Sequence, residues 1–380
     1  MKLNEFQGKE LLKKAGITTP LGELASTPPE VREIAERLHS GSCVIKAQVL
    51  SGKRGKAGLV RIVSSAAEAE IIGAELIGRE HDGCKVERVL VEEKLDIAKE
   101  LYMSFLLDGA RGNINMLFSE AGGIDIETAA KQDEGAVAGI VIPDPEPPRE
   151  FFFRKEMRAL GFRGKELLKL SETAFKLCGL FFEYDLTLAE INPLAVLKDG
   201  TIAAADAKLE VDNNALFRHP ELGSVRDELS DPMEIRAHEI GVTYVQMGGT
   251  VGVIASGAGL AMNTMDILAA KGMGAANFLE TGGGINSKLM EESVMLLMDN
   301  PKVEGLIVNL YGGVNPMVAA AEGIVAGYAK ASGKVPLVVK ILGNQQAEAW
   351  EIVEKAGLEI IKDVHTEKAI DLLIEKMRRS

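Results

Sequence analysis

The stretch TLAEINPL, residues 187–194, and the run TIAAADAK, residues 201–208, decide how the first half of this chain folds. Between them lies Lys198-Asp199-Gly200, a tight turn in which Gly200 can adopt a positive φ. The pattern predicts a β-hairpin whose first strand ends near residue 197. With these three residues as the loop, Leu197 faces Thr201.

This register fixes which polar side chains of the predicted hairpin meet. It places Asn192 opposite Asp206 and Glu190 opposite Lys208. Because side chains alternate across a strand, all four lie on one face. A two-residue loop would shift the pairing by one position and separate them.

Oxygen ligands gather on that face among apolar neighbours. An amide and two carboxylates make a poor core, whereas Mg²⁺ binds a few hard oxygens and keeps waters and phosphates for the rest. The hairpin therefore predicts a Mg²⁺ site. By itself it is also compatible with the exposed polar face of an ordinary hairpin.

Composition limits the classes of function. The chain has 380 residues, enough for two or three domains with buried cores. A net charge of −13 argues against nucleic acid or an anionic membrane as the main partner. There is no run of about 18 apolar residues, and the three scattered cysteines fit a reducing compartment, so we expect a cytoplasmic protein.

A basic, glycine-rich turn lies between two apolar strands in the N-terminal part. GKRGKAG, residues 52–58, carries three cations, and its glycines would let backbone N–H groups approach phosphate oxygens. A solvated surface hairpin is the alternative. Helices are expected over residues 3–15, 149–160 and 164–179 and after two N-caps, Thr27 and Ser65.

The rhythm of the chain changes after a polar, proline-containing segment at residues 212–240. We place a domain boundary near His238, giving domains 1–238 and 239–380. Beyond it, strand, glycine loop and helix alternate, with strands near residues 251, 277, 303, 337 and 359. This pattern is typical of a doubly wound parallel sheet that binds ligands at the carboxyl ends of its strands.

One loop of that sheet, GGVNP at residues 312–316, is suited to an anion. Asn315 is a good N-cap and Pro316 suits the first helical turn, so the helix N–H groups could hold phosphate. A plain βα turn is the alternative. The turn SGAG, residues 256–259, is a weak match to a dinucleotide site because no acidic residue follows at the required spacing.

Taken together, the motifs resemble the β subunit of succinyl-CoA synthetase along essentially the whole chain. They are Lys46, GKRGKAG (52–58), DIAKELY (96–102), EINPL (190–194), DNNALFR (212–218) and GAGLAM (257–262). The resemblance implies an α/β protein with an N-terminal ATP-grasp domain and a C-terminal flavodoxin-like domain, acting as an αβ or α2β2 complex with an α subunit.

The resemblance also implies roles for particular residues. Nucleotide phosphates are assigned to Lys46, Lys53, Arg54 and Gly55, and the base and ribose to Glu92, Leu95 and Glu100. Asn192 and Asp206 match Mg²⁺ ligands, in agreement with the hairpin argument, and Glu190 matches a glutamate that orients the partner's histidine. Ser256, Gly313, Val314 and Asn315 match substrate- or phosphate-binding positions.

The family reaction passes a phosphoryl group from ATP, or GTP, to a histidine and then to the acid, after which CoA displaces phosphate. The histidine and the main CoA site belong to the α subunit. None of the five histidines here lies in a glycine-rich catalytic loop, so the chain resembles half of an enzyme. A carboxylate such as Glu190 would fix the tautomer of the incoming imidazole.

Several positions depart from the family pattern on the acid-facing side. The family's Gly-Gly-Ile-(Val/Thr)-Arg-Cys-Asp is residues 312–318 here and lacks the arginine and aspartate. Ser256 stands where the family has an asparagine that touches the acid. Leu50 stands where the family often has a histidine, and Leu342 where it has a glutamate. Succinate is the first expectation. The alternatives are another acid, such as malate, citrate or a substituted succinate, and a non-catalytic regulatory or assembly subunit.

Overall fold

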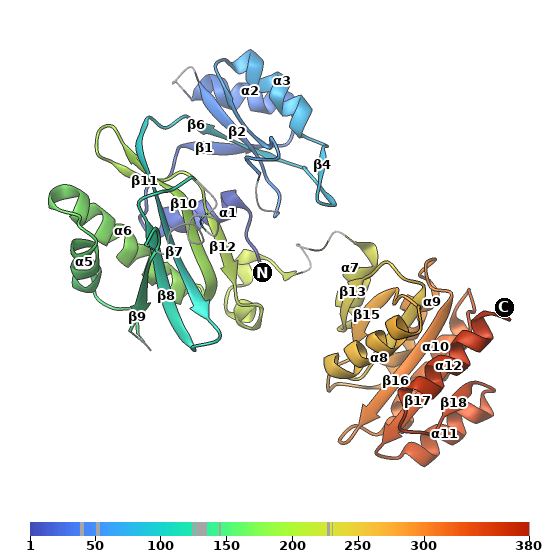
Figure 1. Cartoon of the computed structure of the whole chain (residues 1–380). Coiled ribbons are helices and arrows are strands. Elements are labelled where there is room, and N and C mark those ends of the chain that lie inside the picture. Colours follow the sequence, from blue (N-terminus) through green and yellow to red (C-terminus); the bar gives the residue numbers. More distant parts are fainter. Residues whose placement is uncertain are drawn as a thin grey trace. The chain divides into compact units, whose positions relative to one another are not determined.

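The computed structural model describes residues 1–38, 42–50, 54–123, 126, 135–143, 146–225, 229 and 231–379. The chain divides into two compact units, Met1–Glu228 and Leu229–Ser380 (Figure 1). The boundary that we expected near His238 falls inside α7 (Pro232–Ile240). This helix packs on β13 (Thr243–Gln246) and α9 (Ser287–Met298), so it belongs to the second unit.

A four-stranded antiparallel sheet opens the N-terminal unit. Its order is β1 (Gly22–Ala25), β6 (Val89–Glu93), β2 (Cys43–Ala47) and β3 (Val60–Val63). The helices α2 (Pro28–Arg37) and α3 (Ala66–Leu76) pack on each other and on this sheet. Both predicted N-caps are confirmed, because Thr27 accepts from Glu30 N and Ser65 accepts from Glu68 N.

The second sheet of this unit carries the hairpin. Its order is β11 (Ile202–Ala204), β10 (Leu186–Leu197), β7 (Ile97–Asp108), β8 (Asn113–Ser119) and β9 (Ala138–Ile142), with β12 (Lys208–Val211) also paired to β10. Three helices pack around it: α1 (Glu5–Lys14), α5 (Glu150–Ala159) and α6 (Gly164–Glu183). Fully buried aromatic rings, Phe105 and Phe153 among them, fill the core below the sheet.

The predicted hairpin register is confirmed. Leu197 N donates to Thr201 O at 2.8 Å, and Glu190 pairs with Lys208. Gly200 has a φ of 79°, as the turn required. The ladder on β10 is interrupted between β11 and β12, where Asp206 lies opposite Asn192 by number. The interruption leaves the Ala205 carbonyl available to side chains of other elements.

The C-terminal unit is a six-stranded sheet. Its order is β13, β15 (Asn277–Glu280), β14 (Val251–Ala255), β16 (Gly305–Gly312), β17 (Leu337–Gly343) and β18 (Glu359–Ile361). All neighbours are parallel except β13 with β15, and β13 was not predicted. The parallel strands therefore have the flavodoxin-like order 2-1-3-4-5, which confirms the predicted doubly wound sheet.

Helices cover both faces of this sheet (Figure 1). α8 (Ala258–Ala270) and α12 (Thr366–Met377) share one apolar cluster with it, while α9, α10 (Met317–Lys330) and α11 (Gln346–Lys355) share another. The short elements are β4 (Glu80–His81), β5 (Cys84–Lys85), η1 (Asn213–Arg218) and η2 (Pro220–Leu222). Within the described ranges, the helices are all too short or too polar to cross a bilayer.

Candidate nucleotide and metal site

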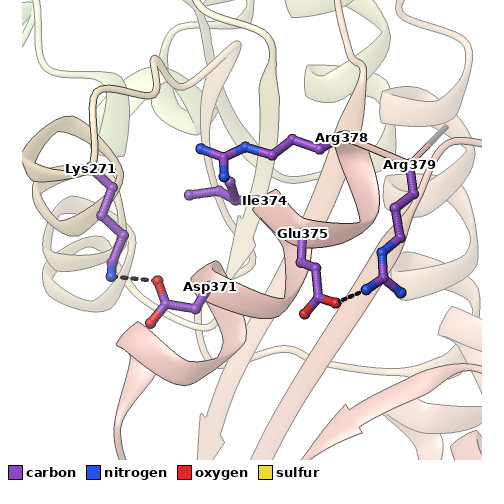
Figure 2. A pocket seen from close by; sticks show the side chains of 6 residues that line it. All are labelled: Lys271, Asp371, Ile374, Glu375, Arg378 and Arg379. Carbon is purple, nitrogen blue, oxygen red and sulfur yellow. Dashed lines mark hydrogen bonds and ion pairs between the residues drawn. The ribbon is translucent and has the colours of Figure 1, made fainter.

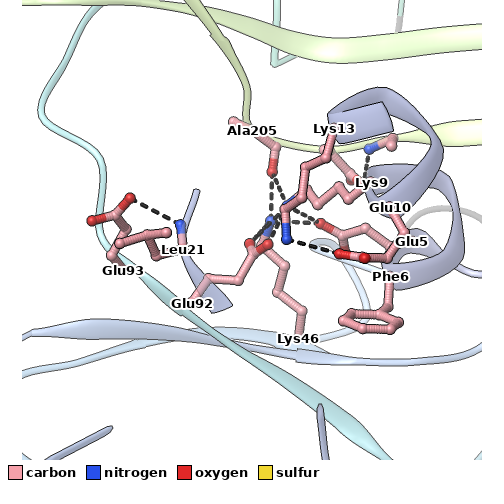
Figure 3. A network of polar contacts seen from close by, with 12 residues as sticks. Glu5, Phe6, Lys9, Glu10, Lys13, Leu21, Lys46, Glu92, Glu93 and Ala205 are labelled. Carbon is pink, nitrogen blue, oxygen red and sulfur yellow. Dashed lines mark hydrogen bonds and ion pairs between the residues drawn. The ribbon is translucent and has the colours of Figure 1, made fainter. Parts of the chain in front are cut away.

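A cluster of charged side chains is buried where α1 meets β2, β6 and the interrupted hairpin (Figure 3). Lys46, on β2, is 8% exposed, and its Nζ lies 2.7 Å from Glu5 Oε1 and 3.0 Å from Glu92 Oε2. It also donates to Ala205 O at 2.6 Å. The predicted phosphate-binding lysine is thus held by acceptors from three separate elements.

Arg54 connects this cluster to the predicted metal ligand. Its Nη1 lies 2.7 Å from Glu5 Oε2, and its Nη2 donates to both carboxylate oxygens of Asp206, at 2.8 and 3.0 Å. One carboxylate, that of Glu5, therefore bridges Lys46 and Arg54, with one oxygen on each cation. The structure brings together Lys46, Arg54 and Asp206, which the sequence assigned to phosphates and metal.

The ion pairs shift the pKa values of these groups. Burial favours neutral forms, but the carboxylates around Lys46 raise the pKa of its ammonium, and those around Arg54 do the same for its guanidinium. Burial also opposes ionisation of Glu5, yet three nearby cations hold the pKa of Glu5 well below its usual value. Partial burial and the Glu5 carboxylate raise the pKa of Asp206.

Asn192 and Glu190 lie along β10 beside the cluster. Asn192 Oδ1 accepts from Gly123 N at 2.7 Å, and a Cβ on Gly123 would lie 2.0 Å from Glu100 Oε2, so Glu100 approaches the same spot. Tyr102 donates to Glu190 Oε2 at 3.3 Å. Burial, together with the Asp206 carboxylate, raises the pKa of Glu190 although Lys208 and Tyr102 oppose this.

The oxygens present fit Mg²⁺. Asn192 supplies an amide oxygen, and Asp206 supplies a carboxylate whose side chain retains 35% of its accessible surface. Mg²⁺ is commonly held by one or two such protein ligands plus phosphates and water. Among the described residues, no group of three or more histidine, cysteine, aspartate or glutamate side chains is arranged to hold a metal ion.

The remaining predicted nucleotide residues are placed differently. Glu92 is 2% exposed and fully engaged with lysines, so in this structure it faces the ion cluster. Leu95 is half-buried in the connection between β6 and β7, and Gly55 is exposed in the turn that Leu59 N closes onto Arg54 O. Lys53 lies outside the described residues.

In the C-terminal unit, Ser256 and residues 312–315 lie at the carboxyl ends of β14 and β16, where the strand order reverses. Ser256 Oγ accepts from Tyr311 N at 2.9 Å and donates to Tyr311 O at 3.1 Å. The hydroxyl therefore ties two strand ends together. Gly313 and Val314 are exposed beside it, Val314 by 90%.

The predicted role of Asn315 as an N-cap is wrong. The N-cap of α10 is Pro316, and the Asn315 amide donates to Gly283 O at 2.6 Å. The first helical N–H, that of Met317, donates to Asn344 O at 3.0 Å. The carbonyl after β17 thus accepts from a backbone N–H that the sequence pattern had predicted to be available to an anion.

Family models match both units. A model described as an ATP-grasp domain matches residues 2–196, and one described as CoA-ligase matches residues 254–373. The chain is 39% identical over 373 residues to the "Succinate--CoA ligase [ADP-forming] subunit beta 1" of Archaeoglobus fulgidus, covering 98% of this chain and 97% of the relative. It is 36% identical over 386 residues to the "Succinate--CoA ligase [ADP-forming] subunit beta" of Rickettsia conorii, covering 100% of both. The chain belongs to the succinate–CoA ligase β-subunit family.

A solved structure has the same architecture. ATP citrate lyase from Methanothrix soehngenii, in complex with citrate and coenzyme A, superposes with a TM-score of 0.77. The superposition covers 98% of this chain and 99% of that chain at 18% sequence identity. At this identity the likeness shows the fold alone.

Two residues of the first helix, α1, were missed by sequence reasoning. Glu5 and Lys9 are 3% and 2% exposed, and Lys9 Nζ lies 2.6 Å from Glu92 Oε1. They share the buried side of α1 with Gly8, Leu11 and Leu12. Charged residues at i and i+4 within an apolar helical stripe are the signal that could have found them.

The Glu5 carboxylate predicts how the stability of the N-terminal unit depends on pH. Because its folded pKa is lowered, its stabilising contribution is full above about pH 4.5 and is lost as the pH falls further. We expect the difference in unfolding free energy between wild type and Glu5→Gln to stay constant from pH 7 to about pH 5 and to shrink as the pH is lowered below about 4.5. Urea unfolding followed by circular dichroism measures it, and fluorescence of the single tryptophan, Trp350, is the control for the other unit.

In the C-terminal unit, a surface hollow of about 500 Å³ lies between α8 and α12 (Figure 2). Ion pairs line it, including Lys271 with Asp371 at 2.5 Å. Both helices run back from the carboxyl edge of the sheet, so their C-terminal ends lie at the opposite edge from Ser256. Within the C-terminal unit, the hollow is therefore separate from the loop that contains Ser256.

Proposed function

We propose that this chain is the β subunit of an ADP-forming succinate–CoA ligase, which converts succinate, CoA and ATP to succinyl-CoA, ADP and phosphate. The observation that carries the proposal is identity of 35–39% over almost the full length to several subunits of that name. We assign to the α partner the histidine that becomes phosphorylated and the main CoA site.

The buried ion cluster supports the nucleotide half of this function. Lys46 and Arg54 are cations held next to Asp206 on one side of the hairpin, where phosphates would meet both charge and metal ligands. We assign the triphosphate to these cations and the base side to Leu95 and Glu100. Phosphoryl transfer depends mainly on positioning and charge neutralisation, which these groups provide.

We assign Mg²⁺ to Asn192 and Asp206. Bound there, the ion would neutralise phosphate oxygens during transfer. Asp206 is paired with Arg54 in this structure, and the Arg54 guanidinium has five donors, so it can turn toward a phosphate while Glu5 still holds it. The exchange would leave the Asp206 carboxylate available to the metal.

We assign to Glu190 the orientation of the partner's histidine. A carboxylate that accepts from one imidazole nitrogen leaves the other nitrogen to take the phosphoryl group. The pKa of Glu190 is raised because its side chain is half-buried, and in such a position a hydrogen bond to the imidazole is stronger than in water.

Glu190→Gln should leave nucleotide binding unchanged and slow histidine phosphorylation by about 100-fold, because the amide keeps the shape but loses the charge that stabilises imidazolium. Rapid-quench transfer of labelled phosphate from ATP to the α subunit measures the rate. Glu210→Gln, two positions along the paired strand, is the control. A Glu190→Gln complex that phosphorylates at the wild-type rate would remove Glu190 from this role.

The function is tested with the complex of this chain and its co-encoded α subunit. CoA-dependent ADP formation is measured with succinate, malate, citrate and substituted succinates. Succinate is expected to give the highest kcat/KM. Preference for another acid would overturn the substrate assignment but keep the chemistry, whereas no turnover with any acid despite nucleotide binding would point to a regulatory subunit.

Location and assembly follow from the same proposal. We place the complex in the cytoplasm, consistent with three cysteines, Cys43, Cys84 and Cys178, that are all free thiols. The complex is αβ or α2β2. Its mass in solution, from light scattering of the purified complex, decides between the two.

A further inference from the structure

Helix α1 buries two charges that packing alone does not require. Glu5 and Lys9 lie on the same buried side as Leu11 and Leu12, where apolar residues would pack at lower cost. The solvent side of the same helix carries a comparable pair, Glu10 with Lys13 at 2.8 Å. The buried pair therefore calls for an explanation that the exposed pair does not.

Lys9 and Lys46 share one set of acceptors (Figure 3). Their Nζ atoms both lie 2.7 Å from Glu5 Oε1, and they donate to Ala205 O at 2.9 and 2.6 Å. Lys9 contacts both oxygens of Glu92, at 2.6 and 2.7 Å, whereas Lys46 lies 3.0 Å from one. An ammonium has three donors, so Lys9 alone can serve all three acceptors.

The duplication has a consequence for Lys46. If Lys46 left and no other cation remained beside Glu92, that carboxylate would be buried and uncompensated, which is strongly unfavourable, whereas Glu5 would keep Arg54. With Lys9 in place, the carboxylates keep a partner when Lys46 moves. Lys9 is also the more deeply buried lysine, at 2% exposed against 8%. Burial and the neighbouring Lys46 lower the pKa of its ammonium, and the contacts with Glu5 and Glu92 are what favour its charged form.

We propose that Lys9 is a positioning residue of the nucleotide site: it neutralises Glu5 and Glu92 so that Lys46 can turn to the nucleotide phosphates. The inference rests on the proposed function, because it takes Lys46 as a phosphate ligand. Helix α1 then supplies, through Lys9, the positive charge that balances the buried carboxylates of the site. Lys9 itself touches no phosphate in this arrangement.

The test is the affinity of the αβ complex for ADP with Mg²⁺, measured by calorimetry. Lys9→Met is expected to raise Kd by about 10-fold or more, because Lys46 is then held by two carboxylates. The KM for ATP should rise with kcat nearly unchanged, a split that general loosening of the fold does not produce. Lys9→Arg should retain affinity within about threefold, and Lys13→Met, on the exposed side of the same helix, should not change it.

A double variant separates charge balance from packing. Glu5→Gln with Lys9→Met removes one charge of each sign, so it should bind ADP at least about threefold more tightly than Lys9→Met alone. If Lys9→Met does not fold, the same double variant, compared with wild type, decides: a Kd within about 10-fold supports the inference, and a larger loss overturns it.

The outcomes are distinguishable from failure of the proposed function. Wild-type affinity in Lys9→Met, or a double variant no better than that single variant, overturns the role of Lys9. Nucleotide binding that follows these expectations without turnover on succinate supports the inference and overturns the substrate assignment. No ADP binding by the wild-type complex overturns both.

Discussion

Asp206→Ala is expected to abolish phosphorylation of the α-subunit histidine, lowering its rate by about 10³-fold or more. The change removes the single carboxylate among the two proposed Mg²⁺ ligands, so that Asn192 is the one proposed protein ligand that remains. Arg54 would keep its contact with Glu5, so the loop should remain in place. Transfer of labelled phosphate from ATP, with Mg²⁺ varied, measures the loss.

The control for this variant lies in the same hairpin. Asp199→Ala changes an exposed aspartate in the turn, whose carboxylate accepts from Thr201 N at 2.7 Å. The Asp199→Ala variant should transfer phosphate at nearly the wild-type rate. If Asp206→Ala still showed Mg²⁺-dependent transfer at the wild-type rate, Asp206 would not be a metal ligand, and the metal site predicted from the hairpin would be wrong.

Lys46→Met is expected to raise the Kd for ADP by about 100-fold, a loss of about 2.8 kcal/mol. The same variant should lose only about 1–2 kcal/mol of unfolding free energy, because Lys9 continues to neutralise Glu5 and Glu92. Calorimetry of ADP binding and urea unfolding of the ligand-free protein provide the two numbers.

The change in ADP affinity and the change in unfolding free energy test two different roles of Lys46. A stability loss of about 3–5 kcal/mol would mean that Glu92 becomes uncompensated without Lys46, which would contradict the proposal that Lys9 can replace Lys46 as its partner. Unchanged ADP affinity would mean that Lys46 is purely structural. Lys13→Met again serves as the control, since its ammonium pairs with Glu10 at the surface.

Much of the fold could be predicted because the deciding interactions are local. The turn at Lys198-Asp199-Gly200 sets the register, and the register places Glu190 opposite Lys208 without knowledge of any other element. The caps Thr27 and Ser65 act within one helical turn. The parallel sheet follows from the alternation of apolar strands with glycine loops.

Other features could not be predicted because their partners come from distant elements. Asn315 has the residue type of an N-cap, but a carbonyl 32 positions away, that of Gly283, takes its amide. The boundary lies before residue 238 because α7 packs on β13 and α9, which follow it in the chain. Neither the contact between Asn315 and Gly283 nor the packing of α7 can be read from the local sequence pattern.

The sequence by itself determined the two-unit α/β architecture and the hairpin, since residue type and spacing fix these, and it predicted which oxygens and cations would act as ligands. Only the tertiary structure decided how their charges are balanced. Lys9 meets Glu92 across 83 positions and Lys46 meets Ala205 across 159, through an interruption in a β-ladder. A buried charge needs a partner, and that partner is chosen by packing, because spacing along the chain does not encode which distant elements come together.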